Sequence, residues 1–310
     1  PNTMSLFIQK AAKEGKNEAW MYVLGTFASF IGGQFIGALP LLYVAFRSGN
    51  TSPETMSNPD ALGIDRNLFL LLMLLPFVVS FGILWWYIRR VHKKRFLVSF
   101  TPFATFNWSR FFTSFLIWFI LSGLFDVILY GIDPGNYEFL GLDIHRFGPL
   151  LAISIFILPI QTTYEELLLR SYLWQGLGIW RANKLVPFLV TSSLFALLHA
   201  MNPEIQEYGY VVLVQYFAVS LLLGLLVMQS DSLELSMGAH LANNMYGSLI
   251  MSAHGSALTT DSLFYIKDSS VTLTSISVYL LVLVIFYNLM RVIFKLPPLR
   301  NAFTKFDVQA

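Results

Sequence analysis

Two adjacent carboxylates followed by an arginine are the part of this sequence best suited to chemistry. They are Glu165, Glu166 and Arg170. Residues four apart share a face of a helix, whereas adjacent residues point about 100° apart. We therefore expect Glu166 and Arg170 to pair, with the carboxylate nearer the helix N-terminus, which is the favoured order. Glu165 is left without that partner and is free to act as a general base.

Two histidines add to this chemistry. Phe195 and His199 are four residues apart, and so are His240 and Asn244, so that each pair lies on one face of a helix. His240 and Asn244 both donate hydrogen bonds, and two such donors inside a membrane can stabilise an oxyanion. Each pair alone has an ordinary explanation in helix packing. Together with Glu165 they predict a buried carboxylate, an imidazole and a donor pair on three helices.

The elements that must position these residues are membrane helices. Of the 310 residues, 55% are hydrophobic and only 12% are Asp, Glu, Lys or Arg, against about 25% charged in an ordinary soluble domain. This composition excludes a soluble globular protein, and the net charge of +2 is too small to indicate nucleic acid as a partner. Because the chain has no cysteine, disulfides, thiolate metal sites and a Cys nucleophile are excluded.

We predict an all-α membrane protein with about eight transmembrane helices, a polar catalytic cavity and cytoplasmic N- and C-termini. A spanning helix needs about 20 apolar residues, and the stretches that qualify or nearly qualify run roughly over 19–46, 67–88, 111–132, 149–175, 185–201, 209–229, 235–253 and 271–290. Positive residues near span ends stay in the cytoplasm. Alternate connecting segments hold 15 and four of the 20 Lys and Arg residues, which favours this orientation.

We expect one polytopic domain over residues 1–310. It comprises the first three spans in 1–148, the motif-bearing core in 149–255, and the last span with its tail in 256–310. The first 18 residues have no apolar core of their own and are not expected to be a cleavable signal peptide. The chain is expected to be a multi-pass protein of the lipid bilayer, in the plasma membrane if the host is prokaryotic.

An ionisable side chain inside the bilayer costs about 2.5–3.5 kcal/mol, so each one marks a candidate functional site. Within the predicted spans these are Asp126, Glu165, Glu166, Arg170, His199 and His240. Asp126 lies near the outward end of its span, from where it could reach the interface, so a structural role is expected for it rather than a part in chemistry. Pro159 is expected to kink the fourth span, which would open room for water.

The three motifs resemble those of the CPBP family, the CaaX proteases and bacteriocin-processing enzymes, also called the Abi family. The resemblance covers about residues 149–255 and consists of EExxxR at Glu165, FxxxH at Phe195 and HxxxN at His240, in the family's order. One departure is Ser171, where many members have Gly. The resemblance implies a glutamic intramembrane endopeptidase, without a cofactor, whose cavity opens to the cytoplasmic side and whose substrate is a membrane-associated peptide or protein.

Carried over residue by residue, the resemblance implies a catalytic set in which the first two residues activate water and the last two hold the oxyanion: Glu165, His199, His240 and Asn244. The supporting residues would be Glu166, Arg170 and Phe195. Aromatic residues that could line the cavity, or simply pack against helices or lipid, are Trp174, Tyr216 and Phe217.

The depths of two catalytic residues do not agree at first sight. Counting residues puts Glu165 about 24 Å below the outer end of its helix. His199, by contrast, lies two residues from the outer end of the predicted fifth span. Either the fifth helix continues past Met201, or the segment around Arg181 dips inward.

Three alternatives stay open. Glu165, His199 and His240 could bind a metal, which would make the chain a metalloprotease that a chelator inactivates. The same cluster could be a proton or ion path in a transporter, although neither discontinuous helices nor repeated halves are visible. It could also be the binding site of a non-catalytic immunity or regulatory scaffold, although such a protein has no need of this costly set of buried polar residues.

Overall fold

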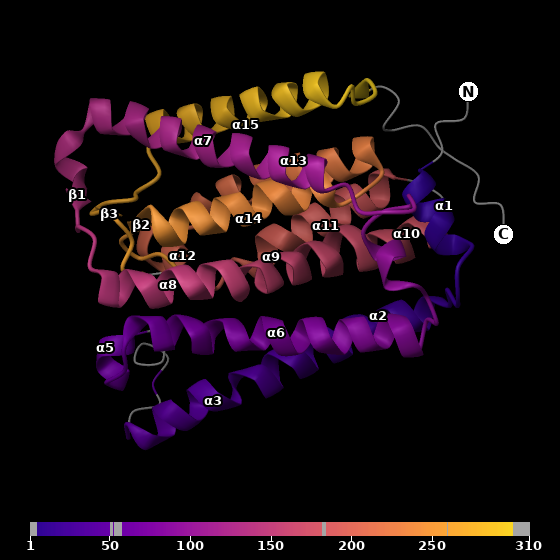
Figure 1. Ribbon diagram of the computed structural model, residues 1–310, viewed down its shortest axis with the longest axis horizontal. Coiled ribbons are helices and arrows are strands. Elements are labelled where there is room, and N and C mark those ends of the chain that lie inside the picture. The colour runs from indigo at the N-terminus through magenta and orange to yellow at the C-terminus, as the bar shows by residue number, and fades with distance from the viewer. Residues whose placement is uncertain (1–4, 50–51, 53–57, 182–183, 259, 300–310) are drawn as a thin grey trace.

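The computed structural model describes residues 5–49, 52, 58–181, 184–258 and 260–299. Long helices run side by side between two polar ends (Figure 1). We call the end that holds α1 (Leu6–Ala12) and the end of α10 (Trp174–Arg181) the basic end. The opposite end, which holds three short strands, is called the sheet end.

The elements that run between the two ends are α2 (Ala19–Phe27), α3 (Gly33–Arg47), α6 (Arg66–Arg90), α7 (Trp108–Ile132), α8 (Ile144–Phe156), α9 (Leu158–Glu166), α10, α11 (Leu185–Leu198), α13 (Val212–Ser230), α14 (Glu234–Leu249) and α15 (Leu273–Ile293). Two π-helical segments, Ala28–Gly32 and Leu167–Leu173, join α2 to α3 and α9 to α10. Shorter pieces at the ends are α5 (Pro59–Leu62), α12 (Pro203–Tyr208) and 3₁₀ turns at Phe96–Ser99 and Pro134–Asn136.

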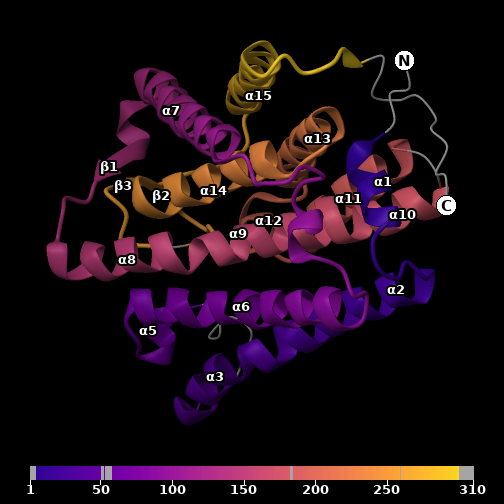
Figure 2. The same cartoon turned by 45° about the vertical axis from the view of Figure 1, so that its right-hand side comes forward.

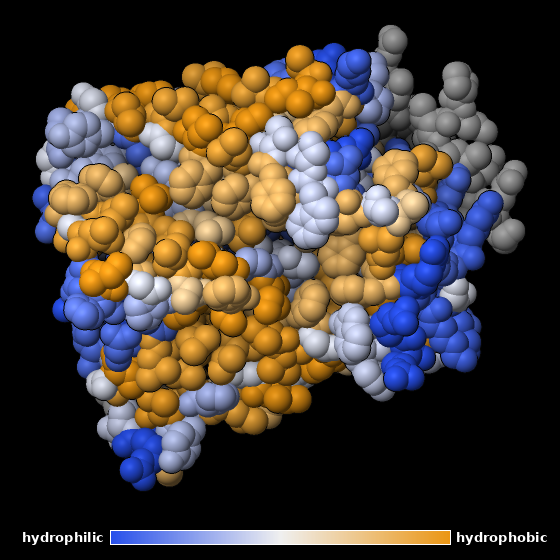
Figure 3. All heavy atoms as spheres, viewed as in Figure 1, coloured by the Kyte–Doolittle hydropathy of each residue, from blue (hydrophilic) through white to orange (hydrophobic). Residues whose placement is uncertain are grey.

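A broad apolar surface lies between the polar ends. In Figure 3 hydrophobic residues cover the middle of the visible face, whereas hydrophilic residues gather at the basic and sheet ends. Large side chains such as Phe46, Val127 and Phe156 are 66–74% exposed. In water such a surface would aggregate, but in a bilayer it matches the hydrocarbon core.

Six of the eight predicted spans coincide with helices long and apolar enough to cross a membrane, namely Ala19–Arg47, Arg66–Arg90, Trp108–Ile132, Ile144–Arg181, Val212–Ser230 and Leu273–Ile293. The other two correspond to α11 and α14, which have 14 and 16 residues. Because a spanning helix needs about 20 residues, the count of eight stays a prediction. The all-α fold class is confirmed.

The segments rich in Lys and Arg lie together at the basic end. Both α1 and the last turn of α15 are there, as are the connections from α6 to α7 and from α10 to α11 (Figures 1 and 2). The positive-inside rule predicts that segments rich in Lys and Arg share one side of the membrane. Their grouping at one end, with both α1 and the end of α15 among them, agrees with an even number of crossings. The cytoplasmic placement of this end remains a prediction.

Close helix contacts are made at small residues. A Cβ at Gly37 would lie 2.3 Å from the Pro76 Cα, and one at Gly33 would lie 2.5 Å from the Ser80 Cα, so the two glycines let α3 approach α6. Likewise, a Cβ at Gly238 would lie 2.2 Å from the Phe111 carbonyl oxygen. This contact brings α14 against α7 two residues before His240, as small residues do in membrane helix pairs.

Three short strands tie the loops of the sheet end together. Their order is β1 (Tyr137–Phe139), β3 (Phe264–Ile266) and β2 (Met251–Ala253). β1 pairs antiparallel with β3, and β2 pairs parallel with it. The sheet therefore joins the loop before α8 to the segment after α14. The helical unit that begins with α8 carries Glu165, and α14 carries His240.

Asp126, for which a structural role was expected, is buried between helices rather than exposed at a polar surface, since it is only 6% exposed. Its Oδ2 accepts a 2.7 Å hydrogen bond from the Tyr246 hydroxyl. Asp126 thus links α7 to α14, and this partner on another helix is what the α7 sequence alone could not indicate.

Candidate active site

The helical unit that carries the EExxxR motif runs from Ile144 to Arg181. It is interrupted at Ile157, two residues before Pro159, as expected for a proline kink. Directly after Glu166 the helix becomes π-helical up to Leu173. π-helical turns are rare and occur frequently at functional sites, and this one holds Arg170.

The apparent mismatch in depth disappears when residues are counted from the basic end. Glu165 lies 16 residues before Arg181, or about 24 Å along its helix. His199 lies 14 residues after Leu185, or about 21 Å along α11. α11 ends at Leu198, so the expectation that the fifth helix continues past Met201 is wrong. An inward dip near Arg181 is not needed, because α11 is a half-length helix that ends beside Glu165.

Glu166 and Arg170 form the expected pair at the centre of a buried network. Arg170 Nη1 donates to Glu166 Oε1 at 3.0 Å, and both side chains are fully buried. Arg170 Nη2 donates to the Ser220 hydroxyl at 2.7 Å, and its guanidinium lies 4.3 Å from the Phe195 ring centroid. The pair thus connects the EExxxR helix to α11 and α13, which is a supporting role.

His240 stands between the two carboxylates. Its Nδ1 lies 2.8 Å from Glu166 Oε1 and its Nε2 lies 3.3 Å from Glu165 Oε2. The second contact is the longer one, and Glu165 Oε2 has no well-formed hydrogen bond although it is shielded from solvent. Glu166 therefore anchors the imidazole, whereas the edge that carries Nε2 faces Glu165 and the cavity.

His199 caps the end of α11 and is held on both faces. Its Nδ1 lies 2.7 Å from the Phe195 carbonyl oxygen, so Nδ1 carries the hydrogen and Nε2 is left as an acceptor. Its ring is stacked on Tyr216, with 4.3 Å between the centroids, and lies 4.4 Å from the Phe195 ring. These contacts fix both the tautomer and the direction of the free nitrogen.

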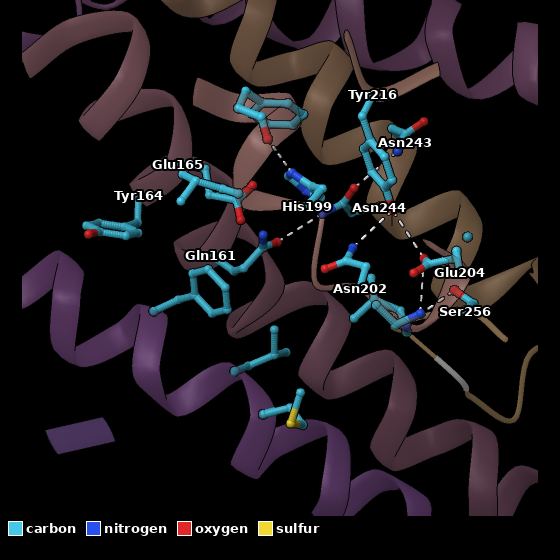
Figure 4. Close-up of a pocket in the computed structure, with 18 of the residues that line it drawn as sticks. Gln161, Tyr164, Glu165, His199, Asn202, Glu204, Tyr216, Asn243, Asn244 and Ser256 are labelled. Atoms are coloured by element: carbon cyan, nitrogen blue, oxygen red, sulfur yellow. Dashed lines mark hydrogen bonds between the residues drawn. The ribbon is translucent and has the colours of Figure 1, made fainter. Parts of the chain in front are cut away.

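A pocket of about 430 Å³ brings these residues together. Figure 4 shows Glu165, Gln161, His199 and Asn244 converging on it from three separate parts of the chain. Asn244 Nδ2 donates to Gln161 Oε1 at 3.0 Å. Glu165, His199 and Asn244 thus line one pocket. His240 lines a smaller pocket of about 60 Å³ that shares His199 and Asn244 with it, and its Nε2 lies 3.3 Å from Glu165 Oε2.

Sequence reasoning missed several polar residues of the pocket. Gln161 lies one helical turn before Glu165. The spacing of four residues between them, which places both on one face of the helix, was the signal that could have identified Gln161. Asn202 Nδ2 donates to the Tyr216 hydroxyl at 3.1 Å, and that hydroxyl donates to Glu204 Oε1 at 3.2 Å. Asn202 and Glu204 follow α11, in the segment expected to connect the fifth and sixth spans, so nothing marked them as polar lining.

Of the three aromatic candidates for the cavity wall, Tyr216 alone lines the pocket. Trp174 is 1% exposed and packs in a hydrophobic cluster near α1, and Phe217 is 37% exposed on the surface. Ser171, the departure from the family pattern, is fully buried.

Part of the pocket lies toward the sheet end. Besides Glu204, its lining includes Met251, Ala253 and 256–258, which lie in the segment after α14. The resemblance implied an opening toward the cytoplasm, whereas the Lys and Arg distribution places the basic end there. The side of the membrane to which the pocket opens stays a prediction.

A metal ligand set does not emerge from this geometry. Within the described parts of the chain, no three His, Asp or Glu side chains are grouped so that they could hold one ion. His240 directs its two nitrogens at Glu165 and Glu166 rather than at a common centre with His199. The residues present therefore do not fit the metalloprotease alternative.

Comparison with known proteins identifies the segment that holds the motifs. Residues 147–246 match the family model described as "Type II CAAX prenyl endopeptidase Rce1-like". The chain is also 29% identical over 234 residues to the uncharacterized protein YyaK of Bacillus subtilis (strain 168), which covers 75% of this chain and 78% of that protein. No solved structure matches the chain significantly. With its six membrane-length helices, the chain is an integral multi-pass membrane protein.

Proposed function

We propose that the chain, whose residues 147–246 match the Rce1-like type II CAAX prenyl endopeptidases, is a metal-free intramembrane endopeptidase for membrane-associated peptides or proteins. The observation that carries the proposal is the meeting of Glu165 and His199. They come from different helices, lie at the same depth and line one pocket. A carboxylate without a cation of its own, opposite an imidazole acceptor, is suited to activating water.

In the proposed mechanism a water molecule lies between Glu165 and His199 Nε2. The Glu165 carboxylate takes one proton of the water as the oxygen attacks the peptide carbonyl carbon. His199 Nε2 accepts a hydrogen bond from the same water and orients it, since its Nδ1 is held by the Phe195 carbonyl. When the C–N bond breaks, the proton on Glu165 passes to the leaving amine, so no covalent intermediate forms.

The negative oxygen of the tetrahedral intermediate would be held by His240 and Asn244. A carboxylate lies at each nitrogen of His240, which favours the charged imidazolium with a hydrogen on both nitrogens. Nδ1–H donates to Glu166, which leaves the Nε2–H with only its long approach to Glu165. Asn244 Nδ2 would exchange its bond to Gln161 for one to the oxyanion. Preorganised donors of this kind act strongly in a site with little water, and each is worth about 10²–10³ in rate.

Glu166 is not the base in this proposal, although it adjoins Glu165. Its Oε1 already accepts from Arg170 and His240, and its side chain has no exposed surface. A carboxylate compensated in this way has little tendency to take a proton from water. The two glutamates thus have separate roles that follow from their different neighbours.

The test is loss of processing in variants that still insert into the membrane. We expect Glu165→Ala and His199→Ala to abolish cleavage of a co-expressed substrate, while Glu207→Ala, at a half-exposed carboxylate outside the pocket, retains it. An unchanged biological effect in both pocket variants would instead favour a non-catalytic binding role. Activity that vanished with a chelator and returned with zinc would contradict the metal-free mechanism.

A further inference from the structure

A series of hydrogen-bonded side chains reaches the pocket from a helix that carries none of the three motifs. Trp118 on α7 is 2% exposed, and its Nε1 donates to Asn243 Oδ1 at 3.3 Å. Asn243 Nδ2 donates to Asn244 Oδ1 at 3.2 Å, and Asn244 Nδ2 donates to Gln161 Oε1 at 3.0 Å. The series therefore connects α7 and α14 to α9.

The series continues to the proposed base. The Gln161 amide interacts with the Glu165 carboxylate, and Figure 4 shows Gln161 between Glu165 and Asn244. Because Gln161 Oε1 already accepts from Asn244, and because an ionised carboxylate only accepts, Gln161 Nε2 is the atom that faces Glu165. We call the four side chains that lead to Glu165 the donor relay: Trp118, Asn243, Asn244 and Gln161.

The two ends of the donor relay fix the orientation of every amide between them. An indole N–H can only donate, and an ionised carboxylate can only accept. A side-chain amide, by contrast, can turn by 180° so that its oxygen and its nitrogen exchange places. If all three amides were reversed, the Trp118 N–H would face an NH₂ group and the Glu165 carboxylate would face a carbonyl oxygen. One orientation alone therefore satisfies both ends of the relay.

This orientation matters most at Asn244, whose Nδ2 is the proposed donor to the oxyanion. When Nδ2 leaves Gln161 for the oxyanion, the amide keeps one anchor, which is the bond from Asn243 Nδ2 to Asn244 Oδ1. Without this anchor the amide could reverse and direct its carbonyl oxygen at the oxyanion. The site would then lose a donor and gain a repulsive contact, both of which raise the barrier.

From these observations we infer that Trp118 and Asn243 are positioning residues of the active site, which hold the Asn244 amide with its NH₂ group toward the developing oxyanion. This inference deepens the proposed function, on which it rests. Trp118 lies outside residues 147–246, which match the family model, so the functional unit extends to α7. The effect of Trp118 and Asn243 on the reaction passes through Asn244.

The first test needs no substrate. The chain has seven tryptophans, so protein labelled with ¹⁵N at the indole nitrogens in dodecylmaltoside micelles gives seven N–H signals in NMR spectra, and Trp118→Phe identifies the signal of Trp118. We expect Asn243→Leu, which keeps the size of the side chain, to move this signal upfield because the N–H loses its acceptor. Asn244→Ala should move it in the same direction by a smaller amount, since hydrogen bonds in a series polarise one another.

The second test measures catalysis with a synthetic peptide that spans a cleavage site found only when Glu165 is intact. Trp118→Phe and Asn243→Leu should each lower kcat about three- to tenfold with an unchanged KM, because the oxyanion develops only toward the transition state. Neither should lower kcat further in the Asn244→Ala background, since both act through that amide. Trp174→Phe removes the same atoms from a buried tryptophan outside the pocket and should leave kcat unchanged.

The outcomes that contradict the inference are distinct. A Trp118 signal that Asn243→Leu or Asn244→Ala leaves in place would mean that the relay does not form. An unchanged kcat in Trp118→Phe and Asn243→Leu, or losses that persist in full in the Asn244→Ala background, would mean that neither residue positions the amide. The absence of any cleavage site that depends on Glu165 would contradict the proposed function alone, because the NMR signals test the relay without cleavage.

Discussion

Removing the charge of Arg170 is expected to destabilise the protein more than any comparable surface change. In Arg170→Met the Glu166 carboxylate would stay fully buried without its cation partner, keeping the bond to His240 Nδ1, and Ser220 would lose the donation from Arg170. Breaking a buried pair by removing one member costs about 3–5 kcal/mol, because it leaves an uncompensated charge. We therefore expect the free energy of unfolding to fall by about that amount.

The assay is reversible unfolding in mixed dodecylmaltoside and SDS micelles, followed by circular dichroism. Arg66→Met provides the matched control, since its bond to Asp261 has the similar length of 3.2 Å but Arg66 is 42% exposed. Exposed pairs contribute less than about 1 kcal/mol. The double variant Glu166→Gln with Arg170→Met removes both charges and should recover a large part of the loss.

The reasoning would be refuted if Arg170→Met unfolded within about 0.5 kcal/mol of the unaltered protein, which is the usual range of surface substitutions. It would also be refuted if the losses of the two single variants simply added in the double variant, since coupled residues in one network do not behave independently.

Three further predictions concern the pocket and the basic end. Asn244→Ala should lower kcat about 10²–10³-fold in a peptide cleavage assay, as loss of one oxyanion donor does. Tyr216→Ala removes the ring stacked on His199 and should lower kcat more than Tyr216→Phe, which keeps the ring. Burial lowers the pKa of Lys94 from 10.5 to about 8, against the opposing charge of Glu14. The unfolded chain then binds more protons between about pH 8 and 10.5, so the unfolding free energy should rise across that window, and Lys94→Met should abolish the rise.

The proposed catalytic residues stand out in the sequence because an ionisable or polar side chain is costly at each of their positions. A carboxylate or imidazole in an apolar stretch needs a reason, and the spacing of four between Glu166 and Arg170 or between His240 and Asn244 is a property of a single helix. The structure places these pairs as the spacing predicts. Contacts between helices, such as His240 standing between Glu165 and Glu166, depend on packing that no local pattern encodes.

The errors arose where an apolar stretch of the sequence is longer than the helix that it forms. Apolar residues continue to about Met201, so the fifth span was expected to be nearly full length, but α11 ends at Leu198. Asn202 and Glu204 therefore seemed to lie outside the membrane region when they in fact line the pocket. Gln161 did not stand out, because the free-energy cost of burying an uncharged amide in a membrane is lower than that of burying a carboxylate.

The central claim is that Glu165 serves hydrolysis, and comparison of protein termini tests it most directly. Membranes of cells that produce the unaltered chain or Glu165→Gln, at matched protein levels, are analysed by mass spectrometry of new N-termini. The account predicts termini that are present with the unaltered chain and absent with Glu165→Gln. An identical set of termini in the two samples, in cells where the unaltered chain has its biological effect, would contradict it.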